Sequence, residues 1–279
     1  MERSSRLKVS LDVVIKSGED DVDMDYALKT LAGTASTTCL LAGAILNQKV
    51  IERRTNANEV RAKLKHSFKS SYGVNFDLVV IDKKLVSRLN VMTKSVFSEV
   101  MSHYISEALY IDPGQKSKEA NDVINDLSNI EDDLVRRLRN PLLEMHKITK
   151  ESGYDVELNY KKRGGKELVI LLNKKTAINI DETKQQNKQY EIEGVITRFN
   201  AMTGNGRLIA KGREDESTIS FGFAGEFKHV SESQKRKISE NLHYNNGINR
   251  DDWSYIKLVV SDIDLISGET IKYAVHQVN

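Results

Sequence analysis

The C-terminal third of the chain holds one turn that we quote in full: Ile196-Thr-Arg-Phe-Asn-Ala-Met-Thr-Gly-Asn-Gly-Arg-Leu208. The two glycines suit a tight turn, because glycine adopts left-handed backbone angles without steric cost. The residues on either side suit two antiparallel strands. We therefore predict a hairpin formed by residues 193–199 and 206–211.

The residues that follow this hairpin complete a predicted five-stranded domain. A third strand is expected at 218–223, and strands four and five at 256–264 and 270–278. Between strands three and four lies a helix, 231–242, which begins with the capping pair Ser231 and Gln234. Five short strands with this order suit a small closed barrel.

The N-terminal part predicts a separate α+β domain over residues 1–173. Strict alternation of apolar and polar residues indicates strands, whereas apolar residues at three- and four-residue steps indicate helices. The expected strands are 6–16, 60–68, 74–80, 156–162 and 166–172, and the expected helices are 24–47, 84–109 and 117–148. Residues 174–189 are polar and aperiodic, so we predict a linker there, followed by the barrel domain at 190–279.

The predicted barrel resembles the oligonucleotide-binding (OB) fold. Its opening segment, Gly194 to Arg207, is similar to the first hairpin of cold-shock domains. Those domains stack bases on aromatic residues after this turn, whereas this chain has Arg207, Leu208 and Ile209 there. Phe199, Phe221 and Phe223 either replace the stacking residues or fill the barrel core.

The whole chain also resembles uncharacterised bacterial two-domain proteins, through the turn Asn200–Arg207 and the segment Asn241–His243. That resemblance implies an α+β domain followed by a barrel, and an association with anti-phage defence clusters. It implies no activity.

Bulk properties agree with a cytoplasmic protein that has no membrane segment. The 279 residues include 42 Lys and Arg against 40 Asp and Glu, and a single cysteine, Cys39. No apolar signal-peptide core follows the N-terminus. The most apolar run, 31–46, is too short and too rich in threonine to span a bilayer.

Charge is distributed unevenly between the two predicted domains. Residues 1–189 hold 31 Lys and Arg against 27 Asp and Glu, whereas residues 190–279 hold 11 against 13. Period-two spacing places basic residues on one face of each of two strands. They are Arg6 and Lys8, and Arg61, Lys63 and Lys65. If these strands are neighbours, the faces merge into a patch that would bind nucleic-acid phosphates. The alternative is a solvated face that prevents edge pairing.

For the barrel we predict a contact with a partner protein at the first hairpin. The residues expected to make it are Arg198, Asn200, Asn205 and Arg207. A purely structural turn is the alternative. The stripe from Val123 to Leu138 keeps a coiled-coil-like spacing, from which we expect a homo-oligomer, with core packing as the alternative.

We predict no catalytic residue, metal or cofactor. The six histidines are dispersed, and the acidic run Asp21 to Asp25 has Tyr26 where a calcium loop needs glycine. The sequence therefore favours a non-enzymatic, self-associating bacterial protein that binds nucleic acid or a partner protein. One alternative is a scaffold or effector subunit of an anti-phage defence assembly. Another is a metal-dependent nuclease or hydrolase whose carboxylates come together from distant positions.

Overall fold

The chain forms two compact units. Its structure is a computed structural model that describes residues 7–50, 60–69, 72–181, 183–212, 218–265 and 268–279. Unit 1 comprises the chain up to Leu109 together with Pro113–Ile180, and unit 2 comprises Tyr110–Asp112 together with Asp181–Asn279. The fold class is α+β, as the sequence predicts: an antiparallel sheet with helices, then a closed five-stranded barrel.

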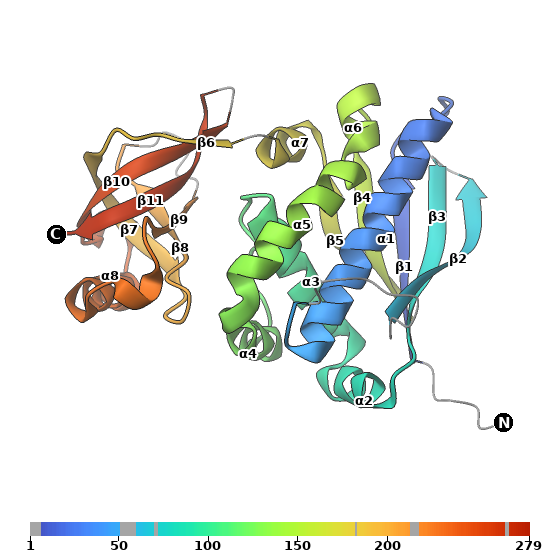
Figure 1. The fold of residues 1–279 in the computed structure, drawn as a ribbon, viewed down its shortest axis with the longest axis horizontal. Helices are drawn as coiled ribbons and strands as arrows, with labels where there is room; N and C mark the ends of the chain where they lie inside the picture. The colour runs from blue at the N-terminus through green and yellow to red at the C-terminus, as the bar shows by residue number, and fades with distance from the viewer. Residues whose placement is uncertain (1–6, 51–59, 70–71, 182, 213–217, 266–267) are drawn as a thin grey trace. The chain divides into compact units, whose positions relative to one another are not determined.

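Unit 1 is built on five antiparallel strands in the order β2-β3-β1-β4-β5. The strands are β1 (Leu7–Ile15), β2 (Val60–Lys69), β3 (Tyr72–Val80), β4 (Val156–Lys162) and β5 (Gly165–Leu172). Alternate residues of β1, Val9, Leu11 and Val13, are at most 1% exposed, so their face of the sheet is the core face. Figure 1 shows α1 and α5 lying across one face of the sheet.

The first six helices of unit 1 lie between these strands in the chain, and the seventh follows β5. They are α1 (Met24–Asn47), α2 (Lys83–Met92), α3 (Lys94–Ala108), α4 (Lys118–Asp126), α5 (Glu131–Met145), α6 (Lys147–Ser152) and α7 (Lys174–Ile180). Helix α1 begins where Asp23 caps it by accepting a hydrogen bond from Tyr26 N, which explains the acidic run before it. At Gly33 a Cβ atom would lie 2.3 Å from Met145 N, so only glycine permits this close approach to α5.

Of the three long helices predicted from the sequence, 24–47 forms as a single helix and the other two are divided. The first breaks at Thr93, whose φ of 68° ends α2 and whose side chain accepts from Val96 N at the start of α3. The second divides into α4, a 3-10 turn, α5 and α6. Pro141 lies inside α5.

The segment predicted as a linker, residues 174–189, contains regular structure. Helix α7 occupies its first half, and β6 (Thr183–Gln185) pairs with β10 in unit 2. The polar sequence still forms a helix because Asn173 and Thr176 bond reciprocally, each side chain accepting from the other's backbone N–H at 3.1 and 2.8 Å. The boundary between the units therefore falls at 180/181.

Unit 2 contains the predicted barrel. Its strands are β7 (Tyr190–Phe199), β8 (Gly206–Ala210), β9 (Ile219–Phe223), β10 (Ile256–Leu265) and β11 (Thr270–Val278). Strand β7 pairs with both β8 and β10, and the parallel pair β9–β11 completes the closure. Helix α8 (Glu232–Asn245) lies between β9 and β10 in the chain, so the topology is OB-like.

The three phenylalanines considered as stacking residues, Phe199, Phe221 and Phe223, lie in the barrel core or pack against it. Phe221 is fully buried, and Phe199 and Phe223 pack partly buried against the same cluster. Phe199 lies parallel to Phe221, with their ring centroids 6.3 Å apart. The burial of Phe221 agrees with the core-filling alternative.

Candidate nucleic-acid interface

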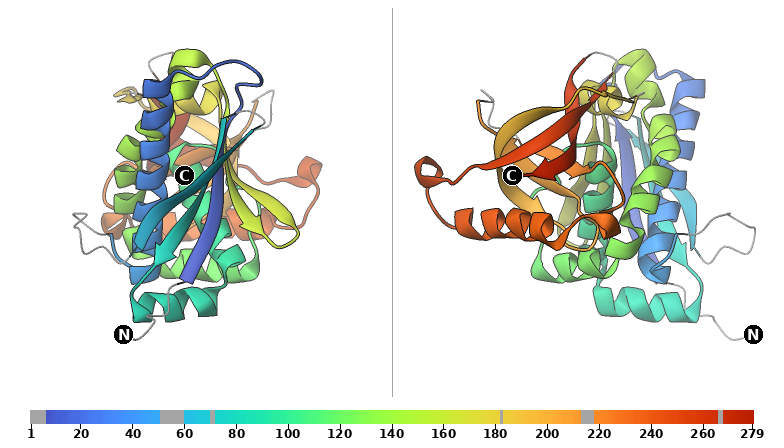
Figure 2. Two further views of the ribbon diagram at one scale, coloured as in Figure 1. Left: turned by 90° about the vertical axis from the view of Figure 1, so that its right-hand side faces the viewer. Right: turned by 60° about the vertical axis from the view of Figure 1, so that its left-hand side comes forward.

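The sheet of unit 1 has a second face, opposite the core face, which we call the polar face. Strand register places Ser10 beside Asp77, Lys63 beside Asp77, and Asp12 beside Asn159, so these side chains share that face. The left view of Figure 2 shows α1, the blue helix, on the other side of the sheet. The polar face carries the basic residues Lys8, Lys16, Arg61, Lys63, Lys65, Lys161 and Lys166 and the acidic residues Asp12, Asp77 and Glu157.

Four of the predicted phosphate-binding residues lie on this face. Lys8 is on β1, and Arg61, Lys63 and Lys65 are on β2. The two strands are not neighbours, since β3 lies between them, but they present these residues on the same side. Arg6 lies outside the described residues.

A buried carboxylate holds two of these lysines in place. Asp77, 2% exposed, lies 3.1 Å from Lys65 Nζ and 3.6 Å from Lys8 Nζ, and accepts a 2.8 Å hydrogen bond from Ser10 Oγ. Burial would raise the pKa of Asp77, but the hydrogen bonds from Ser10 and Lys65 and the charges of both lysines outweigh it and lower the pKa. Asp77 therefore stays ionised at neutral pH.

A second carboxylate, on the other side of β1, also holds two lysines in place. Glu157 lies 2.9 Å from Lys16 Nζ and 3.5 Å from Lys166 Nζ. Here too burial would raise the pKa of Glu157, and the bond and charge of Lys16 are the main causes that lower it. Each carboxylate is thus shared by two ammonium groups, which leaves each trio with a net charge of one positive unit.

Three further polar residues of this face were missed by the sequence-based prediction. Lys161 Nζ donates a 2.6 Å bond to Asn75 Oδ1, and Asn75 Nδ2 lies 3.1 Å from His66 Nε2. Since a lysine can only donate, the amide oxygen faces Lys161, and the NH₂ group faces a ring nitrogen of His66 that accepts. The polar residues Glu157, Asn159 and Lys161 alternate along the sequence, and this pattern could have predicted that Lys161 lies on the polar face.

In the barrel, the predicted contact residues largely build their own turn. Asn200 Oδ1 accepts from Met202 N and Thr203 N, and Asn205 Oδ1 accepts from Lys272 Nζ at 3.3 Å. Gly204 adopts a φ of +77°, as the sequence predicts for this turn. Asn200, Asn205 and Arg198 are partly exposed, and their contact with a partner protein stays a prediction.

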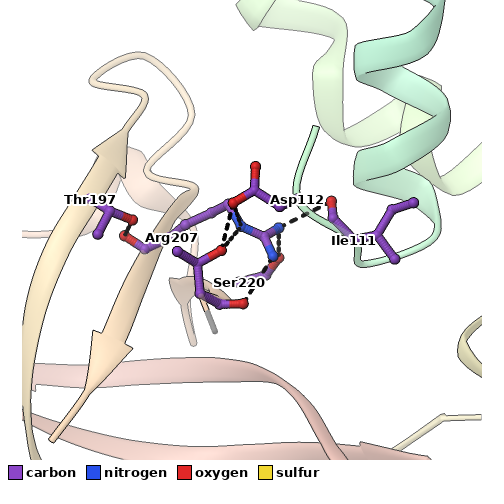
Figure 3. Close-up of polar contacts among 6 residues, drawn as sticks. Ile111, Asp112, Thr197, Arg207 and Ser220 are labelled. Atoms are coloured by element: carbon purple, nitrogen blue, oxygen red, sulfur yellow. Dashed lines mark hydrogen bonds and ion pairs between the residues drawn. The ribbon is translucent and has the colours of Figure 1, made fainter. Parts of the chain in front are cut away.

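Arg207 is buried, being only 4% exposed. Its guanidinium donates to Thr218 Oγ1 at 2.9 Å, to Ser220 Oγ at 3.0 Å and to Thr218 O at 3.1 Å, and also to Ile111 O at 3.3 Å (Figure 3). Asp112 Oδ2 accepts a 2.8 Å bond from Thr218 Oγ1 and lies 3.8 Å from Arg207 Nε. Arg207 therefore fastens residues 110–112 to the barrel.

This segment contacts Arg207 on β8 and Thr218 just before β9, and Arg207 and Ser220 are register partners in these strands. OB folds bind oligonucleotides on the face formed by their second and third strands. In unit 2 the chain's own residues Ile111 and Asp112 contact that surface.

Comparisons with protein-family models, with curated proteins and with solved structures gave no match. Among the described residues, no three His, Cys, Asp or Glu side chains form a group that could hold a metal ion. In the same part of the chain no helix has the length and apolar character needed to cross a bilayer.

The stripe proposed for self-association packs inside unit 1. Leu127, Leu134 and Leu138 are all completely buried there, as the core-packing alternative expects. Val123 and Ile130 of the same stripe are partly exposed, and the homo-oligomer stays a prediction.

Proposed function

We propose that this protein binds the phosphate backbone of nucleic acids through the polar face of unit 1. The observation that carries the proposal is the excess of seven basic over three acidic side chains on one sheet face. Such an excess attracts a polyanion and releases its counterions, so binding weakens steeply with salt.

The paired lysines support this use of the face. Lys8 is 58% exposed and Lys65 44% exposed although both approach Asp77, and Lys16 and Lys166 are similarly exposed beside Glu157. Each ammonium group has three N–H donors, so a lysine can keep its carboxylate and still donate to a phosphate oxygen. The carboxylates reduce the charge of the face but restrict the motion of its cations.

The polar face favours contact with the backbone over contact with bases. The side chains that give this face its charge are six lysines and one arginine, which donate hydrogen bonds to phosphate oxygens. Phosphate contacts carry no sequence information directly, so we expect little dependence on base sequence.

The test is binding of fluorescein-labelled random oligonucleotides, single- and double-stranded, measured by anisotropy between about 50 and 200 mM salt. The double variant Lys8→Glu/Lys166→Glu should bind more weakly. The slope of log affinity against log salt on duplex should fall by about 0.9 for each phosphate that the variant no longer neutralises.

The matched control is Lys211→Glu/Lys257→Glu in unit 2, which makes the same change in net charge. Both lysines are more than half exposed, and each pairs with a glutamate, Glu193 or Glu191. If both double variants weaken binding equally, binding depends only on the net charge of the protein, and the polar face is rejected as the site. At 50 mM salt, charges still attract one another over about 10 Å or more. Absence of binding at this salt concentration would therefore also reject the polar face as the site.

A further inference from the structure

Strand β2 lies at the edge of the sheet in unit 1 (Figure 1). Its inner side pairs with β3, and among the described residues no strand pairs with its outer side. A strand in this position presents backbone N–H and C=O groups along its outer edge, and these can pair with an added strand. The regular part, Val60–Leu64, precedes a bulge at Lys65 and His66.

On the core side, β2 borders an apolar groove. The groove has a volume of about 290 Å³ and lies between β2 and one stripe of α1. Its lining residues are Val13, Leu28, Leu31, Ala32, Thr34, Ala35, Ala62, Leu64 and Phe76. Leu64 is 73% exposed and Leu28 49% exposed, so the groove leaves apolar surface in contact with water.

On the other side, β2 carries charge of one sign. Arg61 and Lys63 point to the polar face because they are register partners of Val79 and Asp77, and Lys65 reaches Asp77 on the same face. Edge strand β2 therefore separates an apolar groove from a row of cations.

We propose that β2 accepts an extended segment of a partner protein in which apolar residues alternate with acidic ones. Successive side chains of a strand point to opposite faces, so one set would enter the groove beside Leu64 and the other would meet Arg61 and Lys63. A second copy of this chain does not fit, since β2 paired with β2 would bring like charges together.

The probe is a fluorescein-labelled octapeptide in which valine alternates with glutamate, with binding followed by anisotropy. One control peptide has the same composition with the four valines grouped, and another has lysine in place of glutamate. Only the alternating acidic peptide should bind with saturation. On binding, the amides of residues 60–64 should become protected from hydrogen exchange.

Two variants of the full chain test the two sides of β2. Leu64→Asn should weaken peptide binding about tenfold, because it replaces an apolar side chain of the groove with a polar one. Lys63→Glu should weaken it at low salt and less at high salt. The matched control is Leu168→Asn on the opposite edge strand β5, where the leucine is 56% exposed; it should leave binding unchanged.

Equal binding of the grouped peptide, or an unchanged affinity in Leu64→Asn, would overturn the proposal. Lack of saturation at millimolar peptide would do so too. These outcomes are distinguishable from failure of the nucleic-acid interface, because Leu64 lies on the core side, whereas the oligonucleotide test changes Lys8 on β1 and Lys166 on β5. An oligonucleotide that protects residues 60–64 and competes with the peptide in a Leu64-dependent way would assign the edge to nucleic acid instead.

Discussion

Lys161 Nζ reaches Asn75 Oδ1 across an intervening strand, with a 2.6 Å hydrogen bond between residues that are 86 positions apart. Asn75 is on β3 and Lys161 on β4, and β1 lies between them. Because Asn75 also contacts His66 on β2, one amide group links the polar side chains of three strands. The polar face is thus a connected arrangement rather than a set of independent surface charges.

We predict that Asn75→Ala lowers the free energy of unfolding by about 1–3 kcal/mol, because it removes both bonds of a side chain that is 4% exposed. Urea unfolding followed by circular dichroism measures this change. The control is Asn121→Ala on α4, which removes an exposed hydrogen bond to Lys116 O and should cost less than about 0.5 kcal/mol. Similar losses in both variants would contradict the linking role of Asn75.

Asp77 provides a prediction for the pH dependence of stability. Its pKa is lowered in the folded state, so its contribution is fully present above the unfolded value and is lost as the pH falls through the lowered folded value. The stability difference between the wild type and Asp77→Asn should therefore be constant from about pH 5 to 7 and shrink below about pH 4. Urea midpoints at several pH values measure it. A difference that persists undiminished at pH 3 would show that Asp77 acts through packing and not through its charge.

The strands and the barrel could be predicted because their signals are local. Alternation in 7–15 and the turn from Asn200 to Gly206 depend on neighbouring residues, and both predictions are confirmed. The order of strands could not be predicted, because periodicity shows which face a residue takes and not which strand lies beside it. For this reason β3 was not expected between β1 and β2, and Lys161 was missed.

The burial of Arg207 illustrates a second limit. An arginine next to a glycine turn has no local feature that distinguishes an exposed position from a buried one. Its partners Thr218, Ser220 and Ile111 lie 11, 13 and 96 residues away in the chain. The break at Thr93 is similar, since no glycine or proline marks it and the residue adopts a positive φ only in its tertiary context.

Gly204 provides a prediction for the barrel turn. A Cβ atom there would lie 2.3 Å from the Phe227 ring, and the φ of +77° strains any other residue. Gly204→Ala should therefore destabilise unit 2 by at least about 1 kcal/mol. Gly225→Ala is the control, because nothing lies within 4 Å of its added methyl group. Thermal unfolding of both variants measures the difference, and equal midpoints would mean that the turn and Phe227 adjust without cost.

Arg207 provides the last prediction, because its guanidinium is buried and donates hydrogen bonds to several acceptors. Arg207→Met leaves Thr218 O and Ser220 Oγ without this donor, and should destabilise unit 2 by about 2–3 kcal/mol. Arg207→Lys should cost less but still measurably, since one ammonium group cannot reproduce the planar fork that serves several acceptors at once.

The chain's single tryptophan, Trp253, lies in unit 2, so its fluorescence during urea unfolding reports on that unit. Arg236→Met is the control, because this arginine is 75% exposed beside Glu232 and its loss should cost under about 0.5 kcal/mol. In Arg207→Met the amides of residues 110–112 should also exchange faster, because the bond to Ile111 O is gone. Unchanged exchange there, together with a stability loss no larger than that of the control, would show that Arg207 does not fasten this segment to the barrel.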